Sequence, residues 1–423
     1  MFLLLIALPV ILPAQDEPSF GIKFKGYVKS DIFYDSRQTV DAREGHFLLY
    51  PKGELPDING EDINAAGKFN ILAIQTRLTG VITGPDAFGA KTSGIIEGAF
   101  FGNIGSDING FRLRHAFVKL TWPKSELLVG QFWHPMFITA SYPGTVSFNT
   151  GAPFEPFARN PQIRFSHKFG RLKAIATAIE QVDFTDMGTM GDLAVATASP
   201  KFLINNGYPE LNLRLEFNQK KEDGNEYLVG AGVNYKSLLP ATSLTYLDPV
   251  TGTPILFRTK ERVAGTSLFG YLKLRFPVLT VKGQIVSGQS MRSMTMLGGY
   301  AVAQEGFDLS SGKVSYTPLK TFSTWVDIHT NGSKVQGGLF AGYTKNNGAL
   351  EDVAPGYFFA RSPDIDYIYR VAPRLIYNVN KVRIAPEIEY TVAAYGSVQN
   401  DGTVADAKEV GNFRFLLGVY YFF

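Results

Sequence analysis

The chain has 423 residues, and its 41 basic and 38 acidic side chains leave a formal net charge of +3. This balance excludes a protein whose main surface binds nucleic acid, because such a surface needs a clustered excess of Lys and Arg. The chain contains no cysteine, which excludes a disulfide framework, thiol catalysis and cysteine-ligated metal centres. Its 33 Phe, 20 Tyr and 43 Gly are typical of β-proteins with many glycine-containing turns.

Residues 1–14 have the pattern of a secretory signal peptide that is removed from the mature protein. The apolar run from Phe2 to Leu12 is followed by a small residue, Ala14. No Lys or Arg precedes the run, which leaves open a translation start upstream of Met1. The alternative is a membrane anchor, but a run this short that also contains Pro9 does not span a ~30 Å hydrocarbon core. Residues 15–423 are expected to form a single domain.

Apolar and polar residues alternate along most of the mature chain, which is the pattern of β-strands with one apolar face. The clearest example is 210–218, ELNLRLEFN, where every second residue is apolar. The pattern predicts sixteen strands, at 21–35, 68–82, 90–101, 111–122, 125–132, 160–169, 171–181, 209–218, 226–237, 262–276, 278–288, 313–329, 333–345, 366–378, 381–394 and 410–423. Two of them, 111–122 and 313–329, alternate poorly, which indicates a bulge or a different contact on the outer side.

The predicted connections differ in length according to their position in the chain. Joins from an even-numbered to an odd-numbered strand are short, such as 123–124, 170 and 331–332. Joins from an odd-numbered to an even-numbered strand are mostly long: 36–67, 133–159, 182–208, 238–261, 289–312, 346–365 and 395–409. Short turns at one rim and long loops at the other are typical of an outer-membrane β-barrel.

We therefore predict an all-β fold, a transmembrane antiparallel up-and-down β-barrel of about 16 strands in the bacterial outer membrane, in contact with its lipid. Alternation alone does not separate this fold from a soluble β-sandwich, whose apolar faces pack inward. Strand length does, because many predicted strands reach 10–15 residues. Tilted membrane strands need ~9–11 residues, whereas strands of soluble proteins average about 5–6.

The chain ends in an aromatic strand, FLLGVYYFF, with Phe423 as its last residue. This ending resembles the signal that the bacterial barrel-assembly machinery recognises; the alternative is an ordinary core strand. Aromatic girdles of membrane barrels lie at the headgroup level, near strand ends. The tyrosines placed near predicted strand ends are Tyr34, Tyr50, Tyr367, Tyr369, Tyr420 and Tyr421.

If the apolar face meets lipid, the polar face lines a wet lumen, and its charge sets the ion preference of a channel. The predicted inward basic residues are Lys23, Lys25, Lys29, Arg77, Arg112, Arg114, Arg164, Lys168, Arg214, Lys273, Arg275, Lys282, Arg370, Arg374, Lys381, Arg383 and Arg414. The predicted inward acidic residues are Asp31, Glu210, Glu216, Asp327, Asp366, Glu387 and Glu389. This excess of basic residues favours anions, although cross-strand pairing into structural ladders is the alternative, expected for Glu216, Glu387 and Glu389.

The long loop 133–159 is aromatic, rich in proline and poor in charge, and such a loop exposed to water would be anomalous. We predict that it folds into the lumen and narrows the channel; the alternative is burial at a subunit interface. Its polar groups are His134, Glu155 and Arg159. The predicted narrow, cationic zone consists of Arg112, Arg114, Arg159 and Arg164, and the further candidate pore-lining residues are Arg214, Arg370, Arg374 and Arg383.

Motifs of enzymes and cofactor sites are missing from the sequence. The five histidines have no metal-ligand spacing, and neither a P-loop nor a serine-hydrolase elbow occurs. Two of them, His115 and His167, could face outward, where some barrels carry a Ser/His pair, but no nucleophile and orienting partner stand at a recognisable spacing. We therefore predict a protein that is not an enzyme and needs no cofactor or metal.

Four segments resemble the DcaP-like family of trimeric outer-membrane porins: GYVKSDIFYDSR (26–37), LRHAFVKLTW (113–122), LLVGQFWHPM (127–136) and PFARNPQIRF (156–165). The resemblance implies a 16-stranded homotrimer that passes small anionic solutes, such as dicarboxylates, through an Arg-lined constriction. The only residues of this chain to which the resemblance assigns a role in this constriction are Arg112, Arg114, Arg159 and Arg164. Some members have a helical coiled-coil segment before the barrel. Here the first strand follows the signal closely, so a trimer would rest on barrel contacts alone.

The leading hypothesis is a passive porin with a preference for anions. A substrate-specific channel for phosphate or a carboxylate is the alternative within transport. A plugged, non-conducting barrel in a structural or secretion-associated assembly belongs to a different class, and a soluble β-protein is the last alternative.

Overall fold

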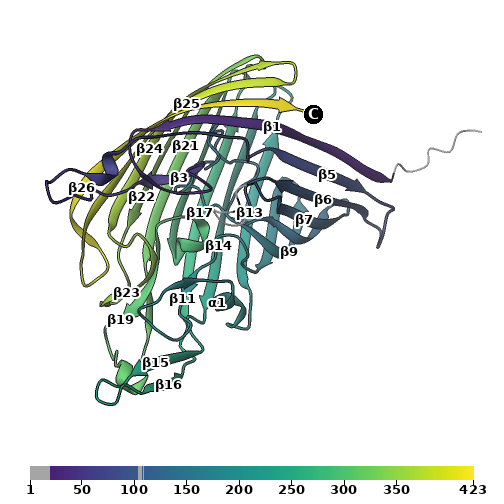
Figure 1. Cartoon of the computed structure of the whole chain (residues 1–423). Helices are drawn as coiled ribbons and strands as arrows, with labels where there is room; N and C mark the ends of the chain where they lie inside the picture. The colour runs from purple at the N-terminus through teal and green to yellow at the C-terminus, as the bar shows by residue number, and fades with distance from the viewer. Residues whose placement is uncertain (1–19, 103–106, 108) are drawn as a thin grey trace, which may run out of the picture.

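The computed structural model describes residues 20–102, 107 and 109–423. The predicted signal peptide, 1–14, lies outside the described residues. The chain forms one large antiparallel sheet that closes on itself as a 16-strand barrel (Figure 1). Its strands are β1 (Gly21–Asp35), β4 (Lys68–Leu72) with β5 (Arg77–Thr83), β6 (Lys91–Ala99), β7 (Arg112–Thr121), β8 (Ser125–Trp133), β9 (Arg159–Phe169), β10 (Leu172–Ile179), β13 (Glu210–Lys220), β14 (Glu226–Leu238), β17 (Val263–Arg275), β18 (Leu279–Gln289), β21 (Lys320–Thr330), β22 (Val335–Asn346), β24 (Ile365–Val379), β25 (Val382–Val398) and β26 (Val404–Phe422).

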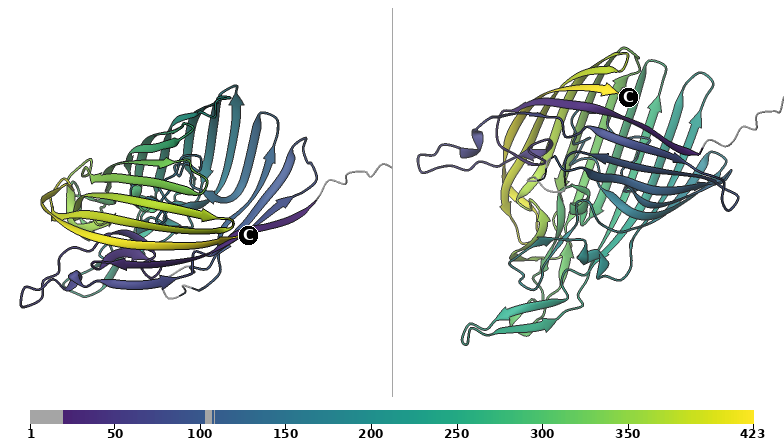
Figure 2. Two further views of the ribbon diagram at one scale, coloured as in Figure 1. Left: turned by 90° about the horizontal axis from the view of Figure 1, so that it is seen from above. Right: turned by 45° about the vertical axis from the view of Figure 1, so that its right-hand side comes forward.

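The barrel closes where the first strand meets the last. β1 pairs with β26 in an antiparallel register that runs from Tyr27 opposite Phe422 to Asp35 opposite Arg414. On its other side β1 pairs with both β4 and β5, which together make one barrel strand interrupted at 73–76. The further views in Figure 2 show the strands wrapping around a common interior. Closure leaves no barrel strand with an unpaired edge.

The two faces of the barrel wall differ as a membrane barrel requires. In β13, Leu211, Leu213 and Leu215 are 50%, 52% and 49% exposed, whereas the alternating Asn212 and Arg214 are 3% and 7% exposed. The apolar side chains therefore cover the outside and the polar ones point into the interior, the reverse of a soluble sandwich. Among the described residues no helix has the length and apolar character of a membrane span.

All sixteen predicted strands are present, but the prediction is wrong in two places along the chain. The strand predicted at 313–329 begins only at Lys320, because β20 (Tyr316–Pro318) pairs instead with β19 (Gly298–Ala303) outside the barrel. The predicted long loop 395–409 is a short turn, since β25 and β26 stay paired up to Val398 opposite Val404.

The poor alternation of 111–122 has the predicted cause, a bulge in β7. Glu97 of β6 lies opposite His115 and the next residue, Gly98, lies opposite Leu113. Arg114 is the extra residue between them, so Arg114 and His115 are both buried on the inner side. Its neighbour Leu113 points outward and is 47% exposed.

The long connections lie at one end of the barrel and carry their own small elements. These are the hairpins β2 (Thr39–Ala42)–β3 (Phe47–Pro51), β11 (Met187–Gly188)–β12 (Thr197–Ala198) and β15 (Ser243–Leu247)–β16 (Pro254–Arg258), the sheet of β19, β20 and β23 (Val353–Arg361), and the short helices η1 (Ile63–Ala65), α1 (Lys201–Ile204), η3 (Met291–Met294) and η4 (Leu309–Ser311). The hairpin β15–β16 projects furthest from the barrel, whereas β2–β3 is largely buried (Figures 1 and 2).

The predicted aromatic girdle is only partly correct. Tyr34 and Tyr421 are exposed on the outside of the barrel, at 44% and 53%. Tyr50 and Tyr420 instead point into the interior, where Tyr50 is buried and the Tyr420 hydroxyl lies 3.4 Å from the Val146 carbonyl oxygen. Tyr50 belongs to the inserted hairpin, and Tyr420 has the parity of the inward-facing residues in β26.

We predict that Leu215→Arg, in the outer apolar belt, lowers the free energy of unfolding by about 2–4 kcal/mol, because a charge is placed against lipid. Denaturant titration of the protein in lipid vesicles measures this change. The matched control is Leu256→Arg, in the exposed hairpin β15–β16, which should change the unfolding free energy by less than about 0.5 kcal/mol. Equal losses in both variants would contradict a lipid-facing belt.

Candidate functional site

The connection between β8 and β9, residues 134–158, lies inside the barrel. Its aromatic side chains Phe137, Phe148, Phe154 and Phe157 are all less than 5% exposed. They pack against the inserted hairpin β2–β3 and against the inner wall in one apolar cluster. We call this segment the inner loop. These four phenylalanine side chains are thus removed from water within a single chain.

Charged side chains of the wall form hydrogen bonds with backbone N–H and C=O groups of the inner loop. The Glu387 carboxylate accepts hydrogen bonds from the backbone N–H groups of Val146 and Ser147, both at 2.8 Å. On the opposite side of this turn, Lys29 Nζ donates to the Val146 carbonyl oxygen at 2.8 Å. Backbone groups without water need such partners, so these charges are structural.

Three of the eight predicted pore-lining arginines donate to carbonyl oxygens in the inserted segments or at Trp133, just before the inner loop, and a fourth pairs with an acid that binds this loop. Arg164 donates to the Trp133 carbonyl oxygen at 2.7 Å, and Arg214 donates to that of Pro135 at 2.9 Å. Arg370 donates to the carbonyl oxygens of Ala152 (2.9 Å) and Leu49 (2.7 Å), and so links the inner loop to hairpin β2–β3. Arg374 pairs with both oxygens of Asp327 at 2.7 and 3.0 Å, and this carboxylate also accepts from the backbone N–H of Gly144 at 3.2 Å.

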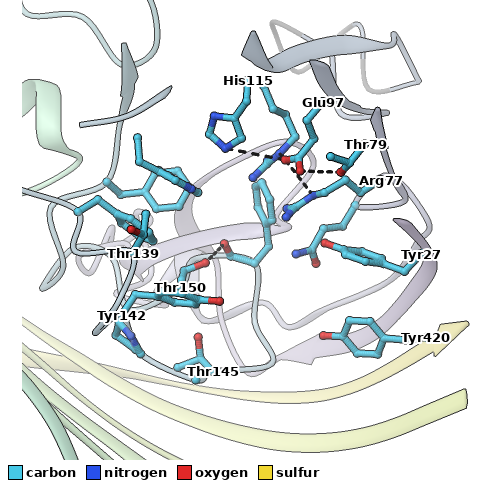
Figure 3. Close-up of a pocket in the computed structure, with 18 of the residues that line it drawn as sticks. Tyr27, Arg77, Thr79, Glu97, His115, Thr139, Tyr142, Thr145, Thr150 and Tyr420 are labelled. Atoms are coloured by element: carbon cyan, nitrogen blue, oxygen red, sulfur yellow. Dashed lines mark hydrogen bonds and ion pairs between the residues drawn. The ribbon is translucent and has the colours of Figure 1, made fainter. Parts of the chain in front are cut away.

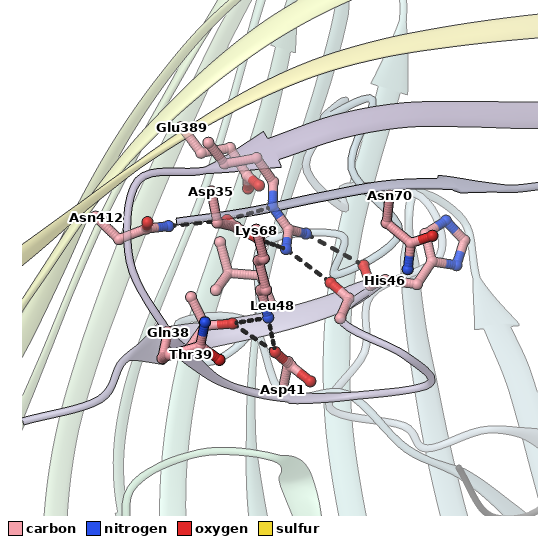
Figure 4. Close-up of polar contacts among 12 residues, drawn as sticks. Asp35, Gln38, Thr39, Asp41, His46, Leu48, Lys68, Asn70, Glu389 and Asn412 are labelled. Carbon is pink, nitrogen blue, oxygen red and sulfur yellow. Dashed lines mark hydrogen bonds and ion pairs between the residues drawn. The ribbon is translucent and has the colours of Figure 1, made fainter. Parts of the chain in front are cut away.

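A second network holds hairpin β2–β3 in the interior (Figure 4). Arg414 donates to both oxygens of Asp35, at 2.9 and 2.6 Å, and to the Gly45 carbonyl oxygen at 2.7 Å. Asp35 also accepts from the Asn412 side chain at 2.9 Å. The neighbouring His46 contacts Asp31. Two inserted segments, not one, therefore fill the interior.

Arg112, Arg114 and Arg159 come together around one aromatic ring. Their guanidinium carbons lie 5.8, 5.5 and 5.7 Å from the centre of the Phe101 ring. We call these three residues the arginine cluster. Arg164, which was predicted to join them, lies instead over Phe132, at 5.4 Å from its ring centre.

Two acidic residues partly neutralise the arginine cluster. Asp183 accepts two hydrogen bonds from Arg159, at 3.0 and 2.7 Å, and a further one from Arg112. Glu97 accepts from Arg114 at 2.8 Å. Burial raises the pKa of Asp183, but Arg159 and Arg112 more than offset this effect and hold its pKa below the ordinary value.

The positive charge at the cluster nevertheless exceeds the negative charge. Among the described residues, one terminal guanidinium nitrogen on each of Arg112, Arg114 and Arg159 has no hydrogen-bond partner. Arg43, in the turn of hairpin β2–β3, adds its charge nearby. Burial and then the charge of Arg112 lower the pKa of Arg43 to about 10. A small anion entering this region would meet N–H donors that have no other partner.

A cavity of about 490 Å³ lies between the inner loop and the wall, toward the end of the barrel with the short turns. Arg383, the eighth predicted residue, lines it together with Arg114, Arg77 and Lys25. Figure 3 shows Arg77, Glu97 and His115 on one side of this cavity and Tyr142 and Thr145 of the inner loop on another. Arg383 stacks on Tyr420 and Phe422, at 5.7 and 5.2 Å from the ring centres.

The sequence analysis missed Glu97, Asp183 and Arg43 as members of this site. Glu97 was detectable, because it has the inward parity of β6. Asp183 and Arg43 lie in loops, which have no period that shows where a side chain points. His115 faces the interior because of the bulge, whereas the imidazole of His167 accepts or donates a hydrogen bond with the Ser125 hydroxyl at 2.8 Å. Within the described part of the chain, His167 has no carboxylate partner that would complete a catalytic triad.

Glu155 is a fully buried acid in the inner loop. Its two carboxyl oxygens have no well-formed hydrogen bond among the described residues, although the Trp325 indole and the Ile138 amide lie close to it. Burial therefore raises the pKa of Glu155 well above its ordinary value. Glu155 is therefore neutral when the inner loop is packed. Ionisation would place an unpaired charge in this buried site and so oppose the packing.

We predict that the packing of the inner loop weakens as the pH rises. The pKa of Glu155 is higher in the packed loop than in the unfolded chain. Neutral Glu155 therefore contributes fully to the stability of the packed loop below the ordinary carboxyl pKa of about 4.3. This stabilisation is lost at higher pH, by up to ~1.4 kcal/mol per pH unit. Hydrogen–deuterium exchange of residues 146–158 between pH 5 and 9, corrected for intrinsic rates, should show this loss. Glu155→Gln should abolish the dependence at residues 150–158, whereas Glu409→Gln, on an exposed part of β26, should retain it. Residues 146–149 are left out of this comparison because they contact Glu387 and Glu389. An unchanged pH dependence in Glu155→Gln would contradict this role.

A scan against models of protein families and a search of curated proteins find no match. Solved structures do match. The crystal structure of the outer membrane channel DcaP of Acinetobacter baumannii has a TM-score of 0.64 and 15% identity, over 97% of this chain and 99% of that one. An anion-selective porin from Comamonas acidovorans has a TM-score of 0.54 and 11% identity, over 96% and 100%. OmpT of Vibrio cholerae, described as a trimer, has a TM-score of 0.52 and 11% identity, over 96% and 100%. The predicted resemblance to DcaP-like porins is thus confirmed for the fold.

Proposed function

We propose that this integral outer-membrane barrel is a porin through which small hydrophilic solutes diffuse passively, with a preference for anions. The fold supports the channel, because the similar structures are outer-membrane channels and porins by description. One of them is an anion-selective porin. The inner loop would then act as the constriction loop, since it narrows the interior from within.

The observation that carries the anion preference is the arginine cluster. Arg112, Arg114 and Arg159 share the carboxylates of Asp183 and Glu97, and Arg43 lies beside them with Asp183 and Asp107 as neighbouring acids. Rings of arginine lower the energy of an anion in a pore and raise that of a cation. A second group of cations, Lys25, Arg77 and Arg383, lines the cavity further along. Two positive zones in series suit solutes with two negative charges, such as dicarboxylates.

A plugged, non-conducting barrel is the second candidate function. The observation that favours it is burial, because Arg114 and Arg159 are only 1% and 2% exposed. The inner loop and hairpin β2–β3 pack tightly against each other and the wall. Planar-bilayer recording decides between the two candidates, since a plugged barrel gives no steps of current.

We predict a reversal potential of anion-favouring sign in a KCl gradient, and a reduced preference in Arg112→Gln. Arg112 is the best choice because Asp183 keeps Arg159 as its partner when Arg112 is neutralised. One unit charge at ~4 Å in a water-like medium is worth about 1 kcal/mol for each ion, with opposite sign for anion and cation, so the anion-to-cation permeability ratio should fall about 30-fold.

The matched control is Lys91→Gln, at the first residue of β6, whose side chain is 83% exposed and pairs with the exposed Asp86. This variant should keep the permeability ratio of the unmodified protein. A cation-favouring reversal potential would contradict the proposal, and so would equal effects of the two substitutions.

Partner interactions belong to the same proposal. The outer apolar belt would contact outer-membrane lipid, and the aromatic C-terminal strand, ending at Phe423, would be recognised by the barrel-assembly machinery. A homotrimer is supported by the trimer form of the similar OmpT structure. Native mass spectrometry of the detergent-extracted protein distinguishes a trimer from a monomer.

A further inference from the structure

We propose that the cavity beside the inner loop is a binding site for aromatic carboxylates, which it retains on their way through the barrel. This inference rests on the proposed porin function and adds a solute class to it. The cavity volume, about 490 Å³, lies in the range of small-molecule sites and exceeds what a short aliphatic acid fills.

The cavity wall is unusually rich in aromatic side chains that face one another. From the inner loop and its entry come Trp133, Phe137 and Tyr142, which form a stack with ring centres 3.9 and 5.5 Å apart and ring planes tilted by 14° and 25°. Tyr142 is 42% exposed, so part of its ring is open to the cavity. Figure 3 places Tyr27 and Tyr420 of the wall across the cavity from Tyr142.

The same wall holds cations that pair with a carboxylate. Arg77 extends into the cavity (Figure 3), and 22% of its side chain is exposed. Its Nε is 3.5 Å from Glu97, a loose contact. Among the described residues its two terminal nitrogens make no ion pair or hydrogen bond, and Lys25 and Arg383 line the cavity nearby. A guanidinium with free terminal N–H groups accepts a carboxylate in a bidentate manner.

Aromatic rings and guanidinium groups alternate along this wall. Arg77 lies over Tyr27 at 5.2 Å from the ring centre, and Arg383 lies over Phe422 at 5.2 Å. A ligand that carries both an aromatic ring and a carboxylate can use both kinds of wall group. Its ring stacks or packs edge-to-face on the aromatic side chains, and its carboxylate pairs with Arg77. A short dicarboxylate satisfies only the cations and leaves the aromatic surface against water.

Hydroxyl groups around the cavity add a polar rim. Thr79 belongs to the wall, and Thr139, Thr145 and Thr150 belong to the inner loop. Figure 3 shows them around the same opening as Arg77. Thr79, Thr145 and Thr150 already donate to the Glu97 carboxylate and to the carbonyl oxygens of Ser147 and Phe148. Their hydroxyl oxygens can still accept from a ring hydroxyl, so hydroxylated aromatic acids fit the cavity better than purely apolar ones.

Equilibrium dialysis of the folded, detergent-extracted protein against radiolabelled benzoate, cyclohexanecarboxylate and succinate tests the site. Benzoate and cyclohexanecarboxylate share the charge and nearly the size, but only benzoate is aromatic. We expect benzoate to bind about 3–10-fold more tightly than cyclohexanecarboxylate, because contacts between aromatic rings add affinity of this size beyond that of apolar burial. Succinate should bind more weakly than both.

Two variants separate the parts of the site. Arg77→Gln should weaken both monocarboxylates about tenfold or more, since a charge-assisted pair is lost. Tyr142→Leu should remove the benzoate preference and leave the binding of cyclohexanecarboxylate within twofold. The control Lys91→Gln should bind all three acids like the unmodified protein. Heat-modifiable gel migration verifies that each variant is folded.

The outcomes distinguish this inference from the proposed function. Equal affinity for benzoate and cyclohexanecarboxylate, or a benzoate preference that survives Tyr142→Leu, would overturn the aromatic site. A channel that conducts anions but binds no benzoate would overturn this inference and leave the porin proposal standing. Benzoate binding by a barrel that passes no current would support the site and overturn the porin proposal.

Discussion

A polypeptide segment placed inside a barrel must find a partner for each backbone N–H and C=O group, and this requirement organises the interior of the protein. The inner loop has little regular structure of its own, so its partners come from the wall. Glu387 accepts from two of its N–H groups, and Lys29, Arg214 and Arg370 donate to its carbonyl oxygens. Charged groups serve this purpose well, because their hydrogen bonds are about twice as strong as neutral ones.

The interior arginines therefore perform two different tasks. Arg214 and Arg370 direct their N–H groups at carbonyl oxygens of the inserted segments, and Arg164 does so at Trp133, where the inner loop begins. Arg112, Arg114 and Arg159 share two carboxylates and retain unpartnered nitrogens. The donors that bind carbonyl oxygens are not available to a solute, so the number of interior arginines overstates the number of N–H groups that an ion would meet.

The fold was predictable from the sequence because a barrel strand has a strict period of two. Parity alone places Leu213 outside and Arg214 inside, and it finds all sixteen strands. Parity does not show what lies opposite an inward side chain, so Arg370 and Arg114 look alike in the sequence. The bulge at Arg114 shifts parity by one residue and turns His115 inward, against expectation. Asp183 and Arg43 come from loops, where no period exists, and only the folded chain brings them to the cluster.

Asp183 lies in the connection between β10 and β13, outside the hydrogen-bonded sheet, yet it is the acid that two residues of the arginine cluster share. The charge inside the barrel is therefore set in part by a segment that does not contribute to barrel closure. Sequence change in this connection can alter the electrostatic profile of the interior while every pair of neighbouring strands stays intact. Solute preference and barrel stability can then diverge independently during evolution, with loops varying over a conserved architecture.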